Sequence, residues 1–253
     1  MRAFACLLFI ALSITGCGRK GPLIYPDLLV PAAPSNVSVQ QSGNFMKLSF
    51  VIPSKDMAGR TITGLYGITV VKRDEPSGLG PVCNSCPTDF LPFRTINLDL
   101  LTPDTQRYGS LLVLLDGSVQ KGRTYTYRVS AVSKDNQQGA VSAPVAADML
   151  ASPGPAVLRV VNHPTEIQLE FEGLPPAEGI IAGYNIYRAL KGESFPLLPL
   201  NREPLTGNRY MDAGLERGVT YSYGVRTVVR LPAGGRLEGD LSNEAEGRLQ
   251  DDE

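Results

Sequence analysis

An eight-residue pattern occurs twice in this chain of 253 residues, and it restricts the possible folds more than any other feature. Residues 122–129 read GRTYTYRV and residues 218–225 read GVTYSYGV, so Gly, Thr, both Tyr and Val recur at matched spacing. A period of roughly one hundred residues is much longer than the repeats of solenoid proteins. The chain is therefore expected to contain two copies of one module.

Apolar and polar residues alternate around this pattern, as they do in half-buried β-strands. Frequent turns are expected from 26 Gly and 20 Pro, a composition typical of all-β sandwiches. The apolar run 111–115 (LLVLL) predicts a buried strand. Further strands are predicted at 34–39, 47–50, 66–70, 94–100 and 140–145, and in the second copy at 155–160, 168–171, 184–188 and 241–245.

The repeated G-x-T-Y-x-Y-x-V pattern resembles strand F of fibronectin type III domains. In that family the first tyrosine forms a corner by bonding back to the backbone, which makes Tyr125 and Tyr221 the candidate corner residues. Such modules bury a tryptophan late in strand B, and Phe50 and Phe171 occupy the nearest aromatic positions here. The resemblance implies an all-β chain with two tandem fibronectin type III-like (immunoglobulin-like) β-sandwiches.

The two sandwiches are expected at residues 32–150 and 151–248. The segment 151–155 (ASPGP) between them is short and rich in proline, which predicts a stiff linker and a restricted angle between the domains. Residues 249–253 end in three acids and are expected to form a disordered tail.

The first residues have the pattern of an export signal. Arg2 precedes the apolar run 3–12, which is too short to span a bilayer as a helix. Residues 14–17 (ITGC) resemble the lipobox of bacterial lipoproteins. The resemblance implies that residues 1–16 are a signal peptide, that Cys17 carries covalent lipid such as palmitate, and that 17–31 is a lipidated tether.

The lipoprotein resemblance also bears on location. Gly18 follows the cysteine, where an aspartate usually retains enterobacterial lipoproteins in the inner membrane. The implied location is therefore the outer membrane, on its periplasmic side or at the cell surface. Two or three acyl chains make such anchoring effectively permanent.

Residues 17–26 (CGRKGPLIYP) also resemble the start of the small lipoprotein that helps to mature the lipopolysaccharide translocon. The candidate contact residues of this motif are Arg19, Lys20, Gly21, Pro22 and Leu23. The alternative is a generic basic tether, in which the two cations favour anionic headgroups.

Cys83 and Cys86 are the cysteines that remain after signal removal and acylation, and an exported chain favours a local disulfide between them. A metal site or a redox pair are the alternatives. Both lie in the insertion 75–93, where Phe90, Leu91 and Phe93 form a possible recognition loop. The alternative is that these apolar side chains pack back onto the edge of the sandwich.

The residues that carry common chemistry are sparse. Loss of Arg2 with the signal changes the formal net charge from −1 to −2, which gives no electrostatic footprint for nucleic acid. His163 is the single histidine and lies in a predicted turn, so neither a histidine-based catalytic site nor a metal site is expected. The carboxylates show no paired spacing, and no enzyme or cofactor other than the lipid is predicted.

These observations predict a non-catalytic, membrane-anchored lipoprotein that acts as a scaffold or binding module at the cell envelope. Its expected partner is an envelope protein or a glycan, and the oligomeric state is left open. The alternative is an assembly factor for lipopolysaccharide transport or other outer-membrane machinery, acting through residues 17–23. A third possibility is an accessory subunit of an extracellular or periplasmic enzyme, whose modules serve as spacers or carbohydrate binders.

Overall fold

The computed structural model describes residues 25–78, 90–232 and 234–250. These residues form strands β1 to β16 and one short 3-10 helix, η1 (Pro26–Leu28), and no α-helix occurs among them. The all-β fold predicted from the sequence is confirmed. The strands build two sandwiches, each around its own hydrophobic core.

The first sandwich has one sheet in the order β1-β2-β6-β5 and a second in the order β4-β3-β7-β8, with β9 also pairing with β7. These orders correspond to strands A, B, E, D and C′, C, F, G of a fibronectin type III-like domain. The strand bounds are β1 (Ser35–Ser42), β2 (Phe45–Val51), β3 (Leu65–Pro76), β4 (Leu91–Asn97), β5 (Thr105–Tyr108), β6 (Leu111–Asp116), β7 (Arg123–Ser133), β8 (Gln138–Val141) and β9 (Val145–Met149).

The second sandwich repeats this plan. Its A, B and E strands form the sheet β10-β11-β13, and β12 and β16 flank β14, which also pairs with β15. The strand bounds are β10 (Val157–Asn162), β11 (Glu166–Glu172), β12 (Ile180–Leu190), β13 (Arg209–Ala213), β14 (Tyr221–Arg230), β15 (Arg236–Leu241) and β16 (Ala245–Gly247).

Phenylalanine fills the two positions at which the family buries a tryptophan. Phe50 is fully buried in the first core, and Phe171 packs against Tyr184 with ring centroids 4.9 Å apart in the second. The apolar run of β6 is buried on both faces: Leu112 and Leu114 enter the first core, while Val113 faces the second domain. Burial on both faces explains why this strand does not alternate.

The closing strands differ from the prediction. The segments expected to be continuous strands at 140–145 and 241–245 are the places where strand G breaks, between β8 and β9 and between β15 and β16. At each break a serine hydroxyl accepts the hydrogen bond of a strand-F backbone N–H, Ser142 from Val129 and Ser242 from Val225. Because the side chain takes the place of a backbone acceptor, the ladder is interrupted there.

Three predicted boundaries also change. The tether is shorter than 17–31, because Leu28 and Val30 already accept backbone hydrogen bonds from Ala58 and Met57 of the first domain. The second domain extends past residue 248, because Leu249 is buried in its core and is 5% exposed. The last three residues lie outside the described chain. Within the insertion 75–93, β3 continues to Pro76 and β4 starts at Leu91 instead of Arg94.

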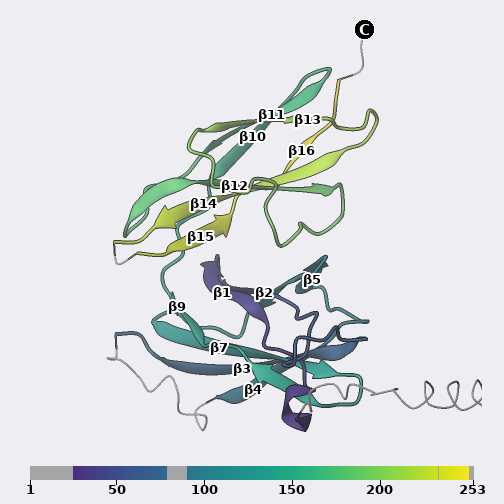
Figure 1. The fold of residues 1–253 in the computed structure, drawn as a ribbon. Helices are drawn as coiled ribbons and strands as arrows, with labels where there is room; N and C mark the ends of the chain where they lie inside the picture. Colours follow the sequence, from purple (N-terminus) through teal and green to yellow (C-terminus); the bar gives the residue numbers. More distant parts are fainter. Residues whose placement is uncertain (1–24, 79–89, 233, 251–253) are drawn as a thin grey trace, which may run out of the picture.

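The two domains share a sheet. Strand β1 of the first domain pairs with β15 of the second, which extends the order to β12-β14-β15-β1-β2-β6-β5. In Figure 1 the second domain lies above the first, with β15 next to β1. The predicted restriction of the interdomain angle thus has a physical basis beyond the linker.

Candidate functional site

The junction between the domains begins with a parallel pairing of two edge strands. Ser42 of β1 lies opposite Glu238 of β15, and the Gly43 N–H donates to the Glu238 carbonyl over 3.0 Å. Gly43 has a positive φ of 60°, and a Cβ there would lie 2.9 Å from the Arg226 guanidinium. The positive φ therefore favours glycine at this turn, and any side chain there would also displace the Arg226 guanidinium.

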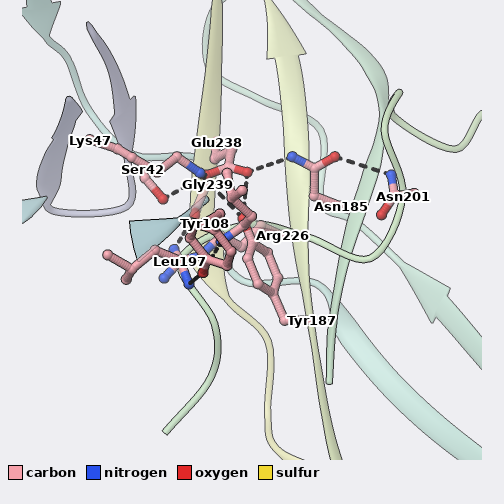
Figure 2. Close-up of polar contacts among 11 residues, drawn as sticks. Ser42, Lys47, Tyr108, Asn185, Tyr187, Leu197, Asn201, Arg226, Glu238 and Gly239 are labelled. Carbon is pink, nitrogen blue, oxygen red and sulfur yellow. Dashed lines mark hydrogen bonds and ion pairs between the residues drawn. The ribbon is translucent and has the colours of Figure 1, made fainter. Parts of the chain in front are cut away.

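The Glu238 carboxylate is the centre of this junction, and it is 1% exposed (Figure 2). Its Oε2 accepts from Lys47 Nζ and from Ser42 Oγ, each at 2.6 Å. Its Oε1 accepts from the Tyr187 hydroxyl at 2.6 Å and from the Asn185 side-chain amide. Both oxygens therefore have two donors, and the donors come from both domains.

The electrostatics follow from this arrangement. Burial alone would raise the pKa of Glu238, but the Lys47 ammonium and the hydrogen bonds from Ser42 and Tyr187 outweigh it and lower the pKa below its usual range. Burial and the adjacent carboxylate raise the pKa of Tyr187, which stays a neutral donor. At neutral pH the site is thus an ion pair held by neutral donors.

A second layer of polar residues holds these donors in place. Asn201 donates to the Asn185 side-chain oxygen over 3.2 Å, and Arg226 donates to the Gly239 carbonyl over 2.7 Å. The Arg226 guanidinium also lies 5.9 Å from the centre of the Tyr187 ring. Supporting contacts of this kind fix the geometry of the inner groups.

The linker is bound from both sides. The Gln41 side chain accepts from the Leu150 N–H at 2.9 Å and donates to the Leu150 carbonyl at 3.0 Å. From the second domain, the Asp240 N–H donates to the Pro153 carbonyl at 3.1 Å, and a Cβ at Gly239 would lie 2.9 Å from that same carbonyl oxygen. The linker is therefore part of the interface.

The opposite end of the junction uses β5. The Leu197 N–H of the second domain donates to Gln106 at 2.8 Å and to the Tyr108 hydroxyl at 3.0 Å. Between the two ends lies a recess of about 260 Å³. Its charged and amide lining residues are Gln40, Lys47, Asn185, Arg202, Glu203, Arg236 and Glu238.

Each domain also contains a buried triad of a tyrosine, an aspartate and a basic residue, which is a lysine in the first domain and an arginine in the second. In the first, the Tyr127 hydroxyl and Lys72 Nζ both donate to Asp116 at 2.7 Å. Burial raises the pKa of Asp116, but Lys72, Ser118 and Tyr127 outweigh it and lower the pKa overall. The triad ties strands C, E and F together.

The second domain repeats the triad. The Tyr223 hydroxyl donates to Asp212 at 2.7 Å, and Arg188 Nη1 donates to both Asp212 oxygens at 2.9 and 2.8 Å. In both copies the aspartate precedes the tyrosine by 11 residues. The duplication therefore preserved a polar tie between the sheets as well as the corner pattern.

Both expected tyrosine corners make the bond that defines them. The Tyr125 hydroxyl accepts from the Gln120 N–H at 2.7 Å, and the Tyr221 hydroxyl accepts from the Glu216 N–H at 3.1 Å. These tyrosines stabilise the turn before strand F in each domain, and their rings lie beside the basic residues of the triads, Tyr125 5.2 Å from Lys72 and Tyr221 5.3 Å from Arg188.

The three residues of the possible recognition loop have different surroundings. Phe90 lies between two guanidinium groups, 5.2 Å from Arg73 and 4.9 Å from Arg128. Phe93 packs against the first core, whereas Leu91 is 68% exposed. Of the apolar surface expected there, only the Leu91 side chain is freely accessible.

The remaining predicted site residues lie outside the described chain, and they are Cys17, Arg19, Lys20, Gly21, Pro22, Leu23, Cys83 and Cys86. Within residues 25–78, 90–232 and 234–250, no group of three or more His, Cys, Asp or Glu side chains could hold a metal ion. In the same residues no helix is long and apolar enough to cross a membrane. His163 lies in the turn between β10 and β11.

The interdomain cluster is not apparent from the sequence. Lys47 and Glu238 are 191 residues apart, and each looks like an ordinary polar position of an alternating strand. The triads could have been predicted in part from the sequence, because in both copies an aspartate stands 11 residues before the second tyrosine of the repeated pattern.

Comparison with known proteins gives shape matches but no family. No protein family and no curated protein matches this sequence. A solved structure described as "Myokine structure" is 17% identical, covers 39% of this chain and 98% of its own, and has a TM-score of 0.31. The FN1–FN3 domains of chicken CNTN1 are 14% identical, with 86% of this chain and 65% of that chain covered and a TM-score of 0.30.

Proposed function

We propose that this chain is a non-catalytic lipoprotein of the cell envelope, anchored through Cys17 in the outer membrane, and that its two sandwiches act together as a rigid scaffold or binding module. The observation that carries the scaffold role is the junction at Glu238. A strand pairing, a buried ion pair and a bound linker hold the domains at one angle. The loops at the two far ends of the two-domain unit are then held at a constant distance from one another.

The chemistry of the buried acids supports a structural role over a catalytic one. Glu238 and Asp116 each accept from several donors and have lowered pKa values, so they stay ionised at neutral pH. A general acid or base works best with a pKa near the operating pH and with access to substrate. Neither condition is met at these two carboxylates.

The anchoring is tested by growing cells with an alkyne-tagged fatty acid and isolating the chain. We expect label on the wild type and on a Cys83→Ser/Cys86→Ser control, and none on Cys17→Ser. Unlabelled wild type would refute the anchor.

The binding role is tested by proximity crosslinking of the full-length chain in its native envelope. The described junction offers a specific comparison, because Glu238→Gln should loosen the angle between the domains without touching the loops. A defined set of crosslinked envelope proteins that changes in this variant is the expected result. The same undefined background from both proteins would count against a scaffold.

The second candidate function is an assembly factor for lipopolysaccharide-transport machinery, which is favoured by the CGRKGPL sequence at residues 17–23. Replacing Arg19 and Lys20 by alanine leaves the acylated cysteine and both sandwiches in place. If translocon maturation fails in that variant, the motif is the functional part. If maturation proceeds normally, the scaffold proposal is retained.

A further inference from the structure

Exposed apolar side chains gather where the chain enters the first domain. Tyr25 is 73% exposed, Leu28 36%, Leu29 40% and Met57 47%. The Leu28 N–H bonds to the Tyr25 carbonyl, and the Met57 N–H bonds to the Val30 carbonyl, so these residues lie side by side. We call Tyr25, Leu28, Leu29 and Met57 the N-terminal patch.

The patch is held in place by the first domain. The Ala58 N–H donates to the Leu28 carbonyl and the Ala32 N–H donates to the Lys55 carbonyl, each at 3.0 Å. These bonds fasten η1 and the residues after it to the loop between β2 and β3. Single exposed apolar residues are common on proteins, but an adjacent group of them marks a contact surface.

The position of the patch points to what covers it. Tyr25 follows Cys17 by eight residues, and eight residues can extend over at most roughly 28 Å. Figure 1 shows η1, the dark purple turn, on the side of the first domain that is remote from β12 and β14 of the second. An acylated Cys17 would therefore keep this patch within reach of the membrane and the second domain away from it.

The composition of the patch suits a lipid surface. Tyrosine prefers the boundary between headgroups and acyl chains, where its ring is apolar and its hydroxyl is hydrated. Leucine and methionine supply the apolar contact. Two exposed charges lie beside them, the cation Lys55, which attracts anionic lipid headgroups, and the acid Asp27 of η1, which opposes that attraction. The upstream Arg19 and Lys20 add attraction to anionic lipids.

We propose that the N-terminal patch rests on the phospholipid surface and sets the orientation of the two-domain unit, with the second domain pointing away from the membrane. This inference rests on the proposed anchoring at Cys17. The lipid chains then supply attachment, and the patch supplies orientation.

The absence of tryptophan from the sequence provides a clean test, because one introduced tryptophan is a single reporter. Met57→Trp places it in the patch. Met211→Trp is the matched control, since Met211 lies in β13 of the second domain and is similarly exposed at 43% against 47%. Full-length lipidated protein is placed in vesicles of phosphatidylcholine and phosphatidylglycerol, with or without brominated lipid that quenches tryptophan.

For Met57→Trp we expect tryptophan emission that shifts to the blue when vesicles are added, and loss of most of that emission when the vesicles contain brominated lipid. For Met211→Trp we expect neither change. Adding Leu29→Asp to Met57→Trp should reverse much of the quenching, because a charged side chain then enters the contact. Equal emission from the two reporters would overturn the proposal, as would quenching of Met211→Trp alone.

A second arm separates this proposal from the anchoring. The chain from Gly18 onward carries an N-terminal hexahistidine and is attached to vesicles that contain a nickel-chelating lipid, so the patch is tested without acylation. Intact mass reports acylation of Cys17 independently. Quenching in the second arm, together with the absence of acyl mass on Cys17, would refute the lipid anchor and retain the membrane contact of the N-terminal patch. An acyl mass on Cys17 without quenching in either arm would retain the anchor and refute the membrane contact.

Discussion

Replacing Glu238 by glutamine should uncouple the two domains. The side chain keeps its shape, but Lys47 is then a buried ammonium, 6% exposed, without a carboxylate. Removing one partner of a buried ion pair costs about 3–5 kcal/mol. Glutamine can still accept from the Tyr187 hydroxyl at the position of Oε1, so we expect the lower end, about 3 kcal/mol.

A change of that size is roughly a hundredfold in the ratio of docked to undocked domains. It is measured with the soluble Cys17→Ser form by urea unfolding, followed by tyrosine fluorescence, and by small-angle X-ray scattering. The wild type is expected to unfold in one transition, and Glu238→Gln in two, with a larger radius of gyration before the first.

Two controls decide whether the reasoning holds. Glu203→Gln removes an exposed ion pair with Arg236 at the edge of the same junction and should change little. Lys47→Met combined with Glu238→Gln removes both charges but keeps an oxygen that can accept from the Tyr187 hydroxyl, and it should recover part of the lost stability because no unpaired charge is then buried. A single transition in Glu238→Gln, or a double variant as unstable as the single one, would refute the argument.

Three further predictions concern the described contacts. The lowered pKa of Glu238 stabilises the docked form at pH values above the carboxyl's ordinary pKa of 4.5, and this contribution is lost as the pH falls through the lower pKa of the docked form. Scattering should therefore show domain separation only at pH values below 4.5, and Glu238→Gln should abolish that step. Tyr125→Phe removes the acceptor of the Gln120 N–H and should cost about 1 kcal/mol in thermal unfolding, with no effect on docking. Asp116→Asn leaves the Lys72 ammonium without its counter-ion and should cost about 2–3 kcal/mol, seen as a lower midpoint of the single urea transition; an unchanged midpoint would contradict the role given to the triad.

The parts of the fold that depend on local pattern could be predicted from the sequence. Most strands of both copies and the corner tyrosines follow from alternation and from one repeated motif, whereas the short strands β5 and β13 are not predicted. The break in strand G could not, because it depends on whether the hydroxyls of Ser142 and Ser242 replace a backbone acceptor. The same holds for Leu249, whose burial depends on the shape of the core that receives it.

The candidate site was beyond sequence analysis for a different reason. Its two charges lie in different domains, and neither shows its burial in its own strand. Only the docking of two copies buries Lys47 and Glu238 together, and docking depends on surface shape over the whole junction. The position of the N-terminal patch depended likewise on hydrogen bonds to the loop at Ala58, which the sequence does not reveal.

The junction between the domains also bears on whether further identical modules could associate in the same way. A head-to-tail contact between identical modules can repeat without end and produce filaments. The two copies differ at the contact. The strand position that holds Lys47 in the first copy holds Gln168 in the second, and the position of Glu238 opposite strand F is taken by Gln138 in the first. The second copy thus has no lysine to offer a third module, and the first has no glutamate to offer a preceding one. Each free end therefore lacks one of the two charges of the Lys47–Glu238 pair, so this ion pair cannot form again at either end of the duplicated unit.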